Sequence, residues 1–321
     1  MRTILLDLLI FLALFAAAEI FLRVFAPETK RLIFSEKITG GHEVSYNEYG
    51  LRDEAFPIKK PKGERRILAL GNSTTFGSGV AVDETWPKVL QQKLGPSWFV
   101  INAGGQGSTL SEMIDFVENQ GLVFKPEIII LGFSPSMIAP PKTSESGTLR
   151  HLLLPLHKAL HASYAYSAFD FYVRKNLYRL GILRDSPRAL YAYEEEAKEA
   201  YEGLARDLDR VSALAHQHNI RLLILGIPSS FEFGNSFENN PRRFPLDQIR
   251  IQPLDQIARL AKEQGIPFTD LREGLKSGPH AYIPGDYTHL NAAGHEITAK
   301  EILQRIPLLS SRTPKAEGSS Y

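Results

Sequence analysis

Hydrophobic and polar positions divide the chain into stretches of different character. Residues 4–25 are almost wholly apolar, whereas residues 28–62 are mostly polar and rich in proline toward their end. From Arg66 onward, short apolar runs alternate with segments whose apolar residues recur at helical spacing, which is typical of strands and helices in turn. After Ser310 the chain is polar again. This pattern predicts an N-terminal apolar helix and one large domain of alternating strands and helices.

The alternation predicts a three-layer α/β fold. The expected strands are residues 66–70, 99–101, 127–131, 221–226 and 267–271, and the expected helices are residues 84–94, 111–123, 188–217, 249–264 and 291–306. Strands that alternate with helices form a mainly parallel, doubly wound sheet with helices on both faces. We therefore expect a five-stranded, flavodoxin-like sheet, in which sites form at the carboxyl ends of the strands.

The same pattern gives the expected organisation of the chain. We expect an anchor or signal segment over 1–26, an extended lead-in over 27–65, the α/β domain over 66–308 and a disordered tail over 309–321. The alternation lapses between Ser134 and Pro187, where prolines, a run rich in serine and threonine, and then aromatic residues follow one another. An insertion or lid over the domain explains this lapse.

The N-terminal apolar segment allows more than one interpretation. As a helix, residues 4–25 would extend for about 33 Å, enough to cross the hydrocarbon core of a membrane. A secretory signal peptide fits the basic Arg2 and the apolar run 8–18. An uncleaved anchor fits the apolar continuation beyond that run, with Glu19 and Arg23 one turn apart on one helix face. We favour the anchor, with the signal peptide and a buried soluble helix as alternatives.

Composition excludes several classes of protein. The chain has no cysteine, so it forms no disulfide, thiolate zinc site or thiol nucleophile. Its 37 basic residues nearly balance 36 acidic ones, which gives no indication of nucleic-acid binding. His157 and His161 lie four residues apart without an evident third ligand, so a solvated helix face explains them better than a metal site. We expect neither a metal nor another cofactor.

A candidate nucleophile follows the first expected strand. Ser73 lies at a strand-to-helix turn beside Gly71, where a serine can project its hydroxyl above the sheet and direct its own N–H at a developing oxyanion. The segment is not the G-x-S-x-G elbow, because Thr75 occupies the last glycine position. It also lacks the lysine of a phosphate-binding loop. A serine that merely caps a helix is the alternative.

A second candidate motif lies near the C-terminal end of the domain. Asp286 precedes His289 by three residues, in a loop between the last expected strand and the last expected helix. A carboxylate there can hold the imidazole in one tautomer while the other ring nitrogen reaches a serine. Together with a serine at a strand end, this pair is typical of a catalytic triad. Capping and helix packing are sufficient explanations for the nearby Asn291 and His295.

Three blocks in this order resemble the SGNH (GDSL-like) hydrolase family over about residues 66–306. The blocks are Gly71-Asn72-Ser73, Asn102-Ala103-Gly104-Gly105-Gln106-Gly107 and Asp286-Tyr287-Thr288-His289. The resemblance implies Ser73 as nucleophile, His289 as general base, Asp286 as the residue that orients it, and Gly107 as the second N–H donor of the oxyanion hole. The lead-in segment 47–53 resembles one common in membrane-anchored bacterial members.

Two positions depart from the family pattern. Asn72 replaces the aspartate of Gly-Asp-Ser, a mild change because that side chain mainly orders the turn. The third block, usually Gly-x-Asn-Asp, reads Gly132-Phe133-Ser134-Pro135 here, so the asparagine donor to the oxyanion is missing. Ser134 can donate one hydrogen bond from a shorter arm. Losing such a donor outright costs about 10²–10³ in rate. Ser134 is therefore a candidate third donor.

The leading functional hypothesis is a serine esterase that acts through an acyl-Ser73 intermediate on an envelope glycan or another ester. One alternative is an acyltransferase to a polysaccharide hydroxyl, and another is a catalytically weak binding protein of the envelope. The resemblance implies a single-pass bacterial membrane protein with a periplasmic or extracellular domain. The basic residues near the anchor do not favour this orientation, although long domains are translocated largely regardless of charge. The sequence predicts no nucleic-acid partner and identifies no protein partner.

Overall fold

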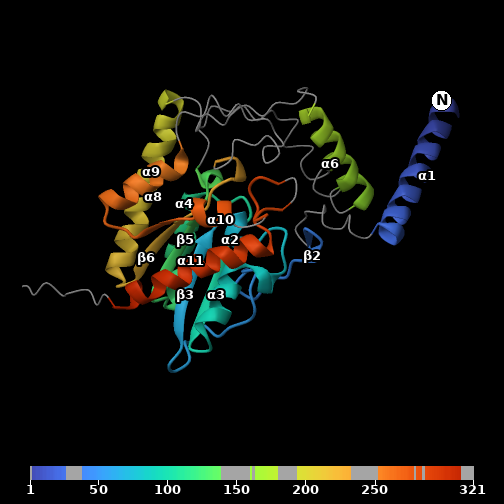
Figure 1. Cartoon of the computed structure of the whole chain (residues 1–321). Helices are drawn as coiled ribbons and strands as arrows, with labels where there is room; N and C mark the ends of the chain where they lie inside the picture. The colour runs from blue at the N-terminus through green and yellow to red at the C-terminus, as the bar shows by residue number, and fades with distance from the viewer. Residues whose placement is uncertain are drawn as a thin grey trace, which may run out of the picture.

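The computed structural model describes residues 2–26, 38–138, 160, 163–179, 194–232, 252–277, 280–283 and 286–311 (Figure 1). A five-stranded parallel sheet lies at its centre, in the order β4-β3-β5-β6-β7. Its strands are β3 (Arg65–Gly71), β4 (Trp98–Gly104), β5 (Ile128–Phe133), β6 (Arg221–Gly226) and β7 (Phe268–Asp270). In chain order these strands lie 2-1-3-4-5, the flavodoxin-like arrangement, so the expected fold is confirmed.

Helices cover both faces of this sheet and make three layers. On one face lie α4 (Leu110–Asn119), α8 (Glu194–Gln217) and α9 (Pro253–Glu263), and on the other lie α3 (Trp86–Leu94), α10 (Arg272–Ser277) and α11 (Ala292–Ser311). Successive side chains of a strand point to opposite faces. In β3, Leu68 and Leu70 accordingly join the first apolar core, and Ile67 and Ala69 join the second.

Several boundaries differ from the expected ones for local reasons. Helix α3 begins at Trp86 because Pro87 suits the first turn of a helix, and the preceding residues form the 3-10 helix η2 (Val82–Glu84). Helix α4 ends at Asn119, and the 3-10 helix η3 (Gly121–Phe124) follows it. The short helix α10 was not expected. Most of the predicted insertion, including residues 139–159 and 180–187, lies outside the described residues, as do the first six residues of the expected helix 188–217 and the tail from 312.

The lead-in, expected as an extended polar stretch, is partly buried against the domain. It contains a two-stranded hairpin of β1 (Ile38–Thr39) and β2 (His42–Glu43). Leu51 and Phe56 join the first apolar core, and the charged side chains of Arg52 and Asp53 are buried as well. The buried charges bond to the backbone and to Lys88.

The apolar helix α1 (Arg2–Phe25) lies apart from the sheet, beside α6 (Tyr164–Arg179) (Figure 1). It is the one helix among the described residues that is long and apolar enough to cross a membrane, a test that a signal sequence also passes. Glu19 and Arg23 form the expected ion pair at 2.6 Å. The Glu19 carboxylate also accepts hydrogen bonds from the Ser163 hydroxyl and the Ala165 N–H, so α1 caps the start of α6.

Helix α6 holds the aromatic residues that the sequence placed in the insertion. The Arg23 guanidinium lies 4.6 Å from the centre of the Tyr164 ring, so this aromatic residue packs against α1. Phe169 and Tyr172 are mostly exposed.

Candidate active site

The carboxyl ends of three adjacent strands, β4, β3 and β5, bring the expected sequence blocks together. Gly71 at the end of β3 lies between Gly104 of β4 and Gly132 of β5 in the register of the sheet. Gly104 has no room for a side chain, because a Cβ there would lie 2.1 Å from the Phe76 backbone nitrogen. The strand ends can therefore approach the turn after β3 closely, and this turn carries Ser73.

The Ser73 turn is a very short helix with caps at both ends. Helix α2 (Ser73–Phe76) begins after Asn72, whose side chain accepts the Thr74 N–H, and it ends at Gly77 in the left-handed region (φ 83°). Asn72 therefore caps this helix, and the alternative interpretation of Ser73 as the cap is wrong. Ser73 is partly exposed while its neighbours are buried, so its hydroxyl is the accessible group of the turn.

Asp286, His289 and Ser73 form one hydrogen-bonded chain. The Nε2 atom of His289 lies 2.9 Å from the Ser73 Oγ atom, and its Nδ1 atom lies 2.6 Å from Asp286 Oδ2. The other Asp286 oxygen accepts the backbone N–H groups of Thr288 and His289. The structure thus brings the Asp286–His289 pair to Ser73, which lies 216 positions before His289 in the sequence.

The environment of Asp286 keeps it ionised. Burial by itself would raise the pKa of this carboxyl, but the adjacent His289 ring and the two backbone N–H groups outweigh burial and lower the pKa. An ionised Asp286 accepts the Nδ1–H of His289 and leaves Nε2 as an acceptor for the Ser73 proton. This geometry can generate a serine nucleophile near neutral pH.

Two backbone N–H groups near the turn are free to donate. Among the described residues, no hydrogen-bond acceptor lies against the N–H of Ser73 or that of Gly107. Gly107 follows β4 with φ at 73°, a backbone conformation that favours glycine. The loop is fixed to the nucleophile strand, because the Gly105 N–H donates to the Gly71 carbonyl at 2.9 Å. Free N–H groups of this kind are what a developing oxyanion requires.

Ser134 is buried at the end of β5 and bonds to the cap of the nucleophile helix. The Asn72 side-chain amide donates to the Ser134 hydroxyl at 2.9 Å and to the Ser136 hydroxyl at 2.7 Å. The two serine hydroxyls lie 2.9 Å apart. Ser134 therefore holds Asn72, and one hydroxyl proton of the serine pair is left for another acceptor. Sequence reasoning missed Ser136, because its link to Asn72 spans 64 residues.

The polar residues Asn291 and His295, which follow the triad loop, contribute to capping and packing. Asn291 accepts the Gly294 N–H and donates to the Tyr282 carbonyl, as expected for a capping residue. His295 is fully buried, and its Nδ1 atom accepts the Trp86 N–H. Burial and the nearby Arg52 charge lower the His295 pKa to about 3, so this ring is neutral.

The described residues contain no group of three or more metal-ligating side chains. The candidate pair His157 and His161 lies outside those residues.

Comparison with known proteins gives a family match. The model of the GDSL-like lipase/acylhydrolase family matches residues 69–297. The structure is similar to a lipase/acylhydrolase from Enterococcus faecalis (14% identity, TM-score 0.43, 78% of this chain and 98% of that one). It is also similar to a carbohydrate acetylesterase family member from Sinorhizobium meliloti (16% identity, TM-score 0.42, 76% and 98%). No curated protein matches the chain significantly.

Proposed function

Because the chain belongs to the GDSL-like lipase/acylhydrolase family, a family of ester-hydrolysing enzymes, we propose that it is a serine esterase with an acyl-Ser73 intermediate. The family match confirms the resemblance indicated by the three sequence blocks. In this proposal Ser73 is the nucleophile, His289 the general base and Asp286 the residue that orients the imidazole. The N–H groups of Ser73 and Gly107 stabilise the oxyanion, with Ser134 as a third donor.

The proposed reaction has two halves. In the first half, the Ser73 Oγ atom attacks the ester carbonyl carbon as its proton passes to His289 Nε2, and the carbonyl oxygen becomes an oxyanion. Collapse of this tetrahedral intermediate breaks the bond to the alcohol, which takes the proton back from His289. In the second half, water repeats these steps on the acyl-serine and releases the acid and the free Ser73 hydroxyl.

The observation that carries the proposal is the chain of contacts from Asp286 through His289 to Ser73, at 2.6 and 2.9 Å. A fluorophosphonate probe tests it, because such probes react with activated serines. We expect the intact protein to be labelled and the Ser73→Ala variant to remain unlabelled. Equal labelling of the two proteins would reject Ser73 as the nucleophile.

We propose an acetyl ester on an envelope glycan as the substrate class to test first. The support is the family match together with an N-terminal helix that is able to hold the domain at a membrane. Release of acetate from an acetylated glycan, measured beside esters of increasing chain length, tests this choice. Transfer of the acetyl group to an acceptor sugar in place of water would instead indicate the acyltransferase.

We further propose that α1 is an uncleaved anchor with the catalytic domain on the outer side of a bacterial cell membrane. Its support is the apolar surface of α1 and the contacts of Glu19, which give a charged residue of the helix a structural role. Protease added to intact spheroplasts should digest the domain. A domain that becomes accessible only after lysis would reverse this orientation.

A further inference from the structure

The lead-in contributes two buried charged residues to the support of the candidate active site. Arg52 and Asp53 follow one another in the chain and are almost fully buried. Buried charges are costly unless they are paired or hydrogen-bonded, so a buried pair outside the triad calls for an explanation. Each of the two side chains bonds to a different element at the carboxyl edge of the sheet.

Arg52 bonds to the segment directly after the nucleophile. Its Nη1 atom donates to the Phe76 carbonyl at 3.0 Å and to the Gly77 carbonyl at 2.7 Å, and its Nη2 atom donates to the Val80 carbonyl at 2.8 Å. The last carbonyls of a helix have no partner within the helix, and a rigid guanidinium fork can satisfy several of them at once. Arg52 thus fixes the C-terminal end of α2.

The end of α2 is in turn bonded to Ser73. The N–H groups of Gly77 and Ser78 both donate to the Ser73 carbonyl at 3.0 Å. Only four residues make up α2, so a shift at its last carbonyls has no long helix to absorb it. Thr39 of the β1 hairpin also bonds to the segment after α2, because its hydroxyl accepts the Gly79 N–H at 2.9 Å.

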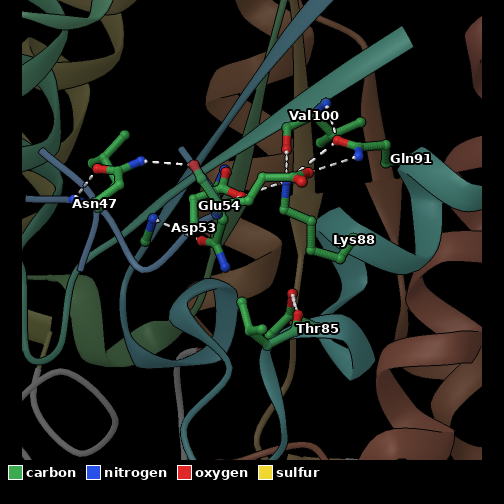
Figure 2. A network of polar contacts seen from close by, with 11 residues as sticks. Asn47, Asp53, Glu54, Thr85, Lys88, Gln91 and Val100 are labelled. Carbon is green, nitrogen blue, oxygen red and sulfur yellow. Dashed lines mark hydrogen bonds and ion pairs between the residues drawn. The ribbon is translucent and has the colours of Figure 1, made fainter. Parts of the chain in front are cut away.

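Asp53 bonds to the strand that leads to Gly107. Its Oδ2 atom accepts the Asn102 N–H of β4 at 2.8 Å, and its Oδ1 atom pairs with Lys88 at 2.5 Å. Figure 2 shows this network, in which Lys88 and Gln91 of α3 also bond to the backbone of Val100. Strand β4 is an edge of the sheet, so these side chains satisfy backbone groups that no further strand pairs.

We propose that the lead-in segment Asn47–Glu54 is a positioning element of the active site, in which Arg52 sets the Ser73 turn and Asp53 sets the strand end that leads to Gly107. This inference rests on the proposed role of Ser73. It makes Arg52 and Asp53 positioning residues, because neither needs to touch the substrate. The segment would thereby align the two N–H groups of the oxyanion hole with each other.

A matched pair of buried arginines tests the proposal. Arg66 is also fully buried and also donates to three carbonyls, those of Pro57, Ile58 and Phe124, but it lies in the first half of β3, away from the Ser73 end. We compare Arg52→Lys with Arg66→Lys in the full chain, since lysine keeps the charge and loses the fork. The readout is the rate of fluorophosphonate labelling per folded protein, with thermal unfolding measured alongside.

We expect both variants to unfold at lower temperature, but only Arg52→Lys to label more slowly, by about tenfold or more, since a small misplacement of a reacting group costs up to about 10²-fold. Equal labelling rates for the two variants would overturn the proposal while leaving Ser73 as nucleophile. A wild-type protein that is not labelled would reject the proposed function itself. If Arg52→Lys does not fold, Asp53→Asn replaces it, since the amide oxygen can still accept the Asn102 N–H while the ion pair with Lys88 is lost. We then expect a labelling rate about threefold below wild type, and an unchanged rate would count against the proposal.

Discussion

The turn that carries Ser73 and the loop that carries Asp286 and His289 meet at the hydrogen bond between Ser73 Oγ and His289 Nε2, at 2.9 Å. The two regions are held in place by different kinds of contact. The Ser73 turn is buried and is bonded to residues far away in the sequence, among them Arg52 and Ser134. The Asp286 and His289 side chains are each about a quarter exposed (26% and 24%), and the hydrogen bonds that orient Asp286 come from within three residues of it.

One half of the site is therefore supported by contacts distant in the sequence and the other half largely by local ones. The two sides of the loop that carries Asp286 and His289, residues 281–283 and 289–291, have hairpin-like bonds, since the Ile283 N–H donates to the His289 carbonyl and the Asn291 N–H donates to that of Ala281. These bonds are local, although the Ser230 N–H also donates to the Tyr287 carbonyl from a distant segment. The nucleophile turn depends on the lead-in and on β5, so distant substitutions should disturb it more. Each prediction below tests one side of this contrast or the contact between the sides.

The largest effect is expected where the two regions meet. Ser73→Ala and His289→Ala should each lower ester hydrolysis by about 10⁴-fold or more, because either change removes the activated nucleophile. The double variant should be no worse than either single variant, since the two residues act as a unit. Initial rates with a chromogenic ester measure this, with His216→Ala on the exposed end of α8 as the control. Additive losses would show that the residues act independently.

The next effect concerns the loop alone. In Asp286→Asn, the amide would direct an N–H at His289 Nδ1, so the ring would keep its proton on Nε2 and could not accept the Ser73 proton. We expect a loss of about 10³–10⁴ in kcat with little change in unfolding temperature. Asp83→Asn, at an exposed site, is the control. A large loss of stability would mean that the loop supports the fold as well as the imidazole.

The contrast also explains what the sequence could predict. The five strands follow from local apolar runs such as Ile128–Leu131, and the Asp286–His289 pair follows from a spacing of three residues. Both features lie within a short window, so one sequence is enough to identify them. The order of the strands and the family resemblance then place Ser73 beside His289.

The supports of the nucleophile have no such local pattern. Arg52 bonds to main-chain carbonyls 24 to 28 residues away, and every residue has a carbonyl, so no particular partner type marks the contact. The link between Asn72 and Ser136 likewise spans 64 residues, which include α3, β4, α4 and β5. The lead-in has few apolar residues, and its hydrophobic pattern therefore predicts an extended stretch, whereas its buried charges hold it in place together with Leu51 and Phe56.

Acid should weaken a buried contact close to both regions, the one between α11 and α3. His295 follows the loop in α11, and its ring accepts the Trp86 N–H of α3. Its pKa falls from 6.5 unfolded to about 3 folded, so below pH 6.5 the unfolded chain binds a proton that the folded one does not, and this contribution to stability is lost as pH falls. From pH 6.5 to 5 the loss is about 2 kcal/mol.

Comparison with His295→Asn isolates this contribution, because Asn can accept the Trp86 N–H but does not titrate. Glu232 has the opposite effect, since burial raises its pKa to about 8 and its contribution falls as pH rises from 4.5 to 8. Glu232 is present in both proteins, so its effect cancels when they are compared. The difference between wild type and variant in the free energy of unfolding, measured with denaturant, should therefore shrink toward pH 5 as the His295 contribution is lost. A difference that is constant with pH would mean that His295 is not held neutral.

The smallest effect concerns Ser134, the buried residue that connects the nucleophile turn to β5. We expect Ser134→Ala to slow acylation by about tenfold, less than the 10²–10³ lost with a full oxyanion donor, because a hydroxyl reaches the oxyanion from a shorter arm than the usual amide. Ser136→Ala is the matched control, since Ser136 also accepts a hydrogen bond from Asn72.

Two arrangements of the serine hydroxyls distinguish the outcomes. If Ser136 donates to Ser134, the Ser134 proton is free for the oxyanion, and Ser134→Ala should slow acylation much more than Ser136→Ala. If Ser134 donates to Ser136, both serines serve only to hold Asn72, and the two variants should be about equally slow. Pre-steady-state release of the alcohol from an activated ester measures acylation directly. Equal rates would assign Ser134 to the support of the nucleophile turn, together with Arg52, and leave the oxyanion to the two backbone N–H groups.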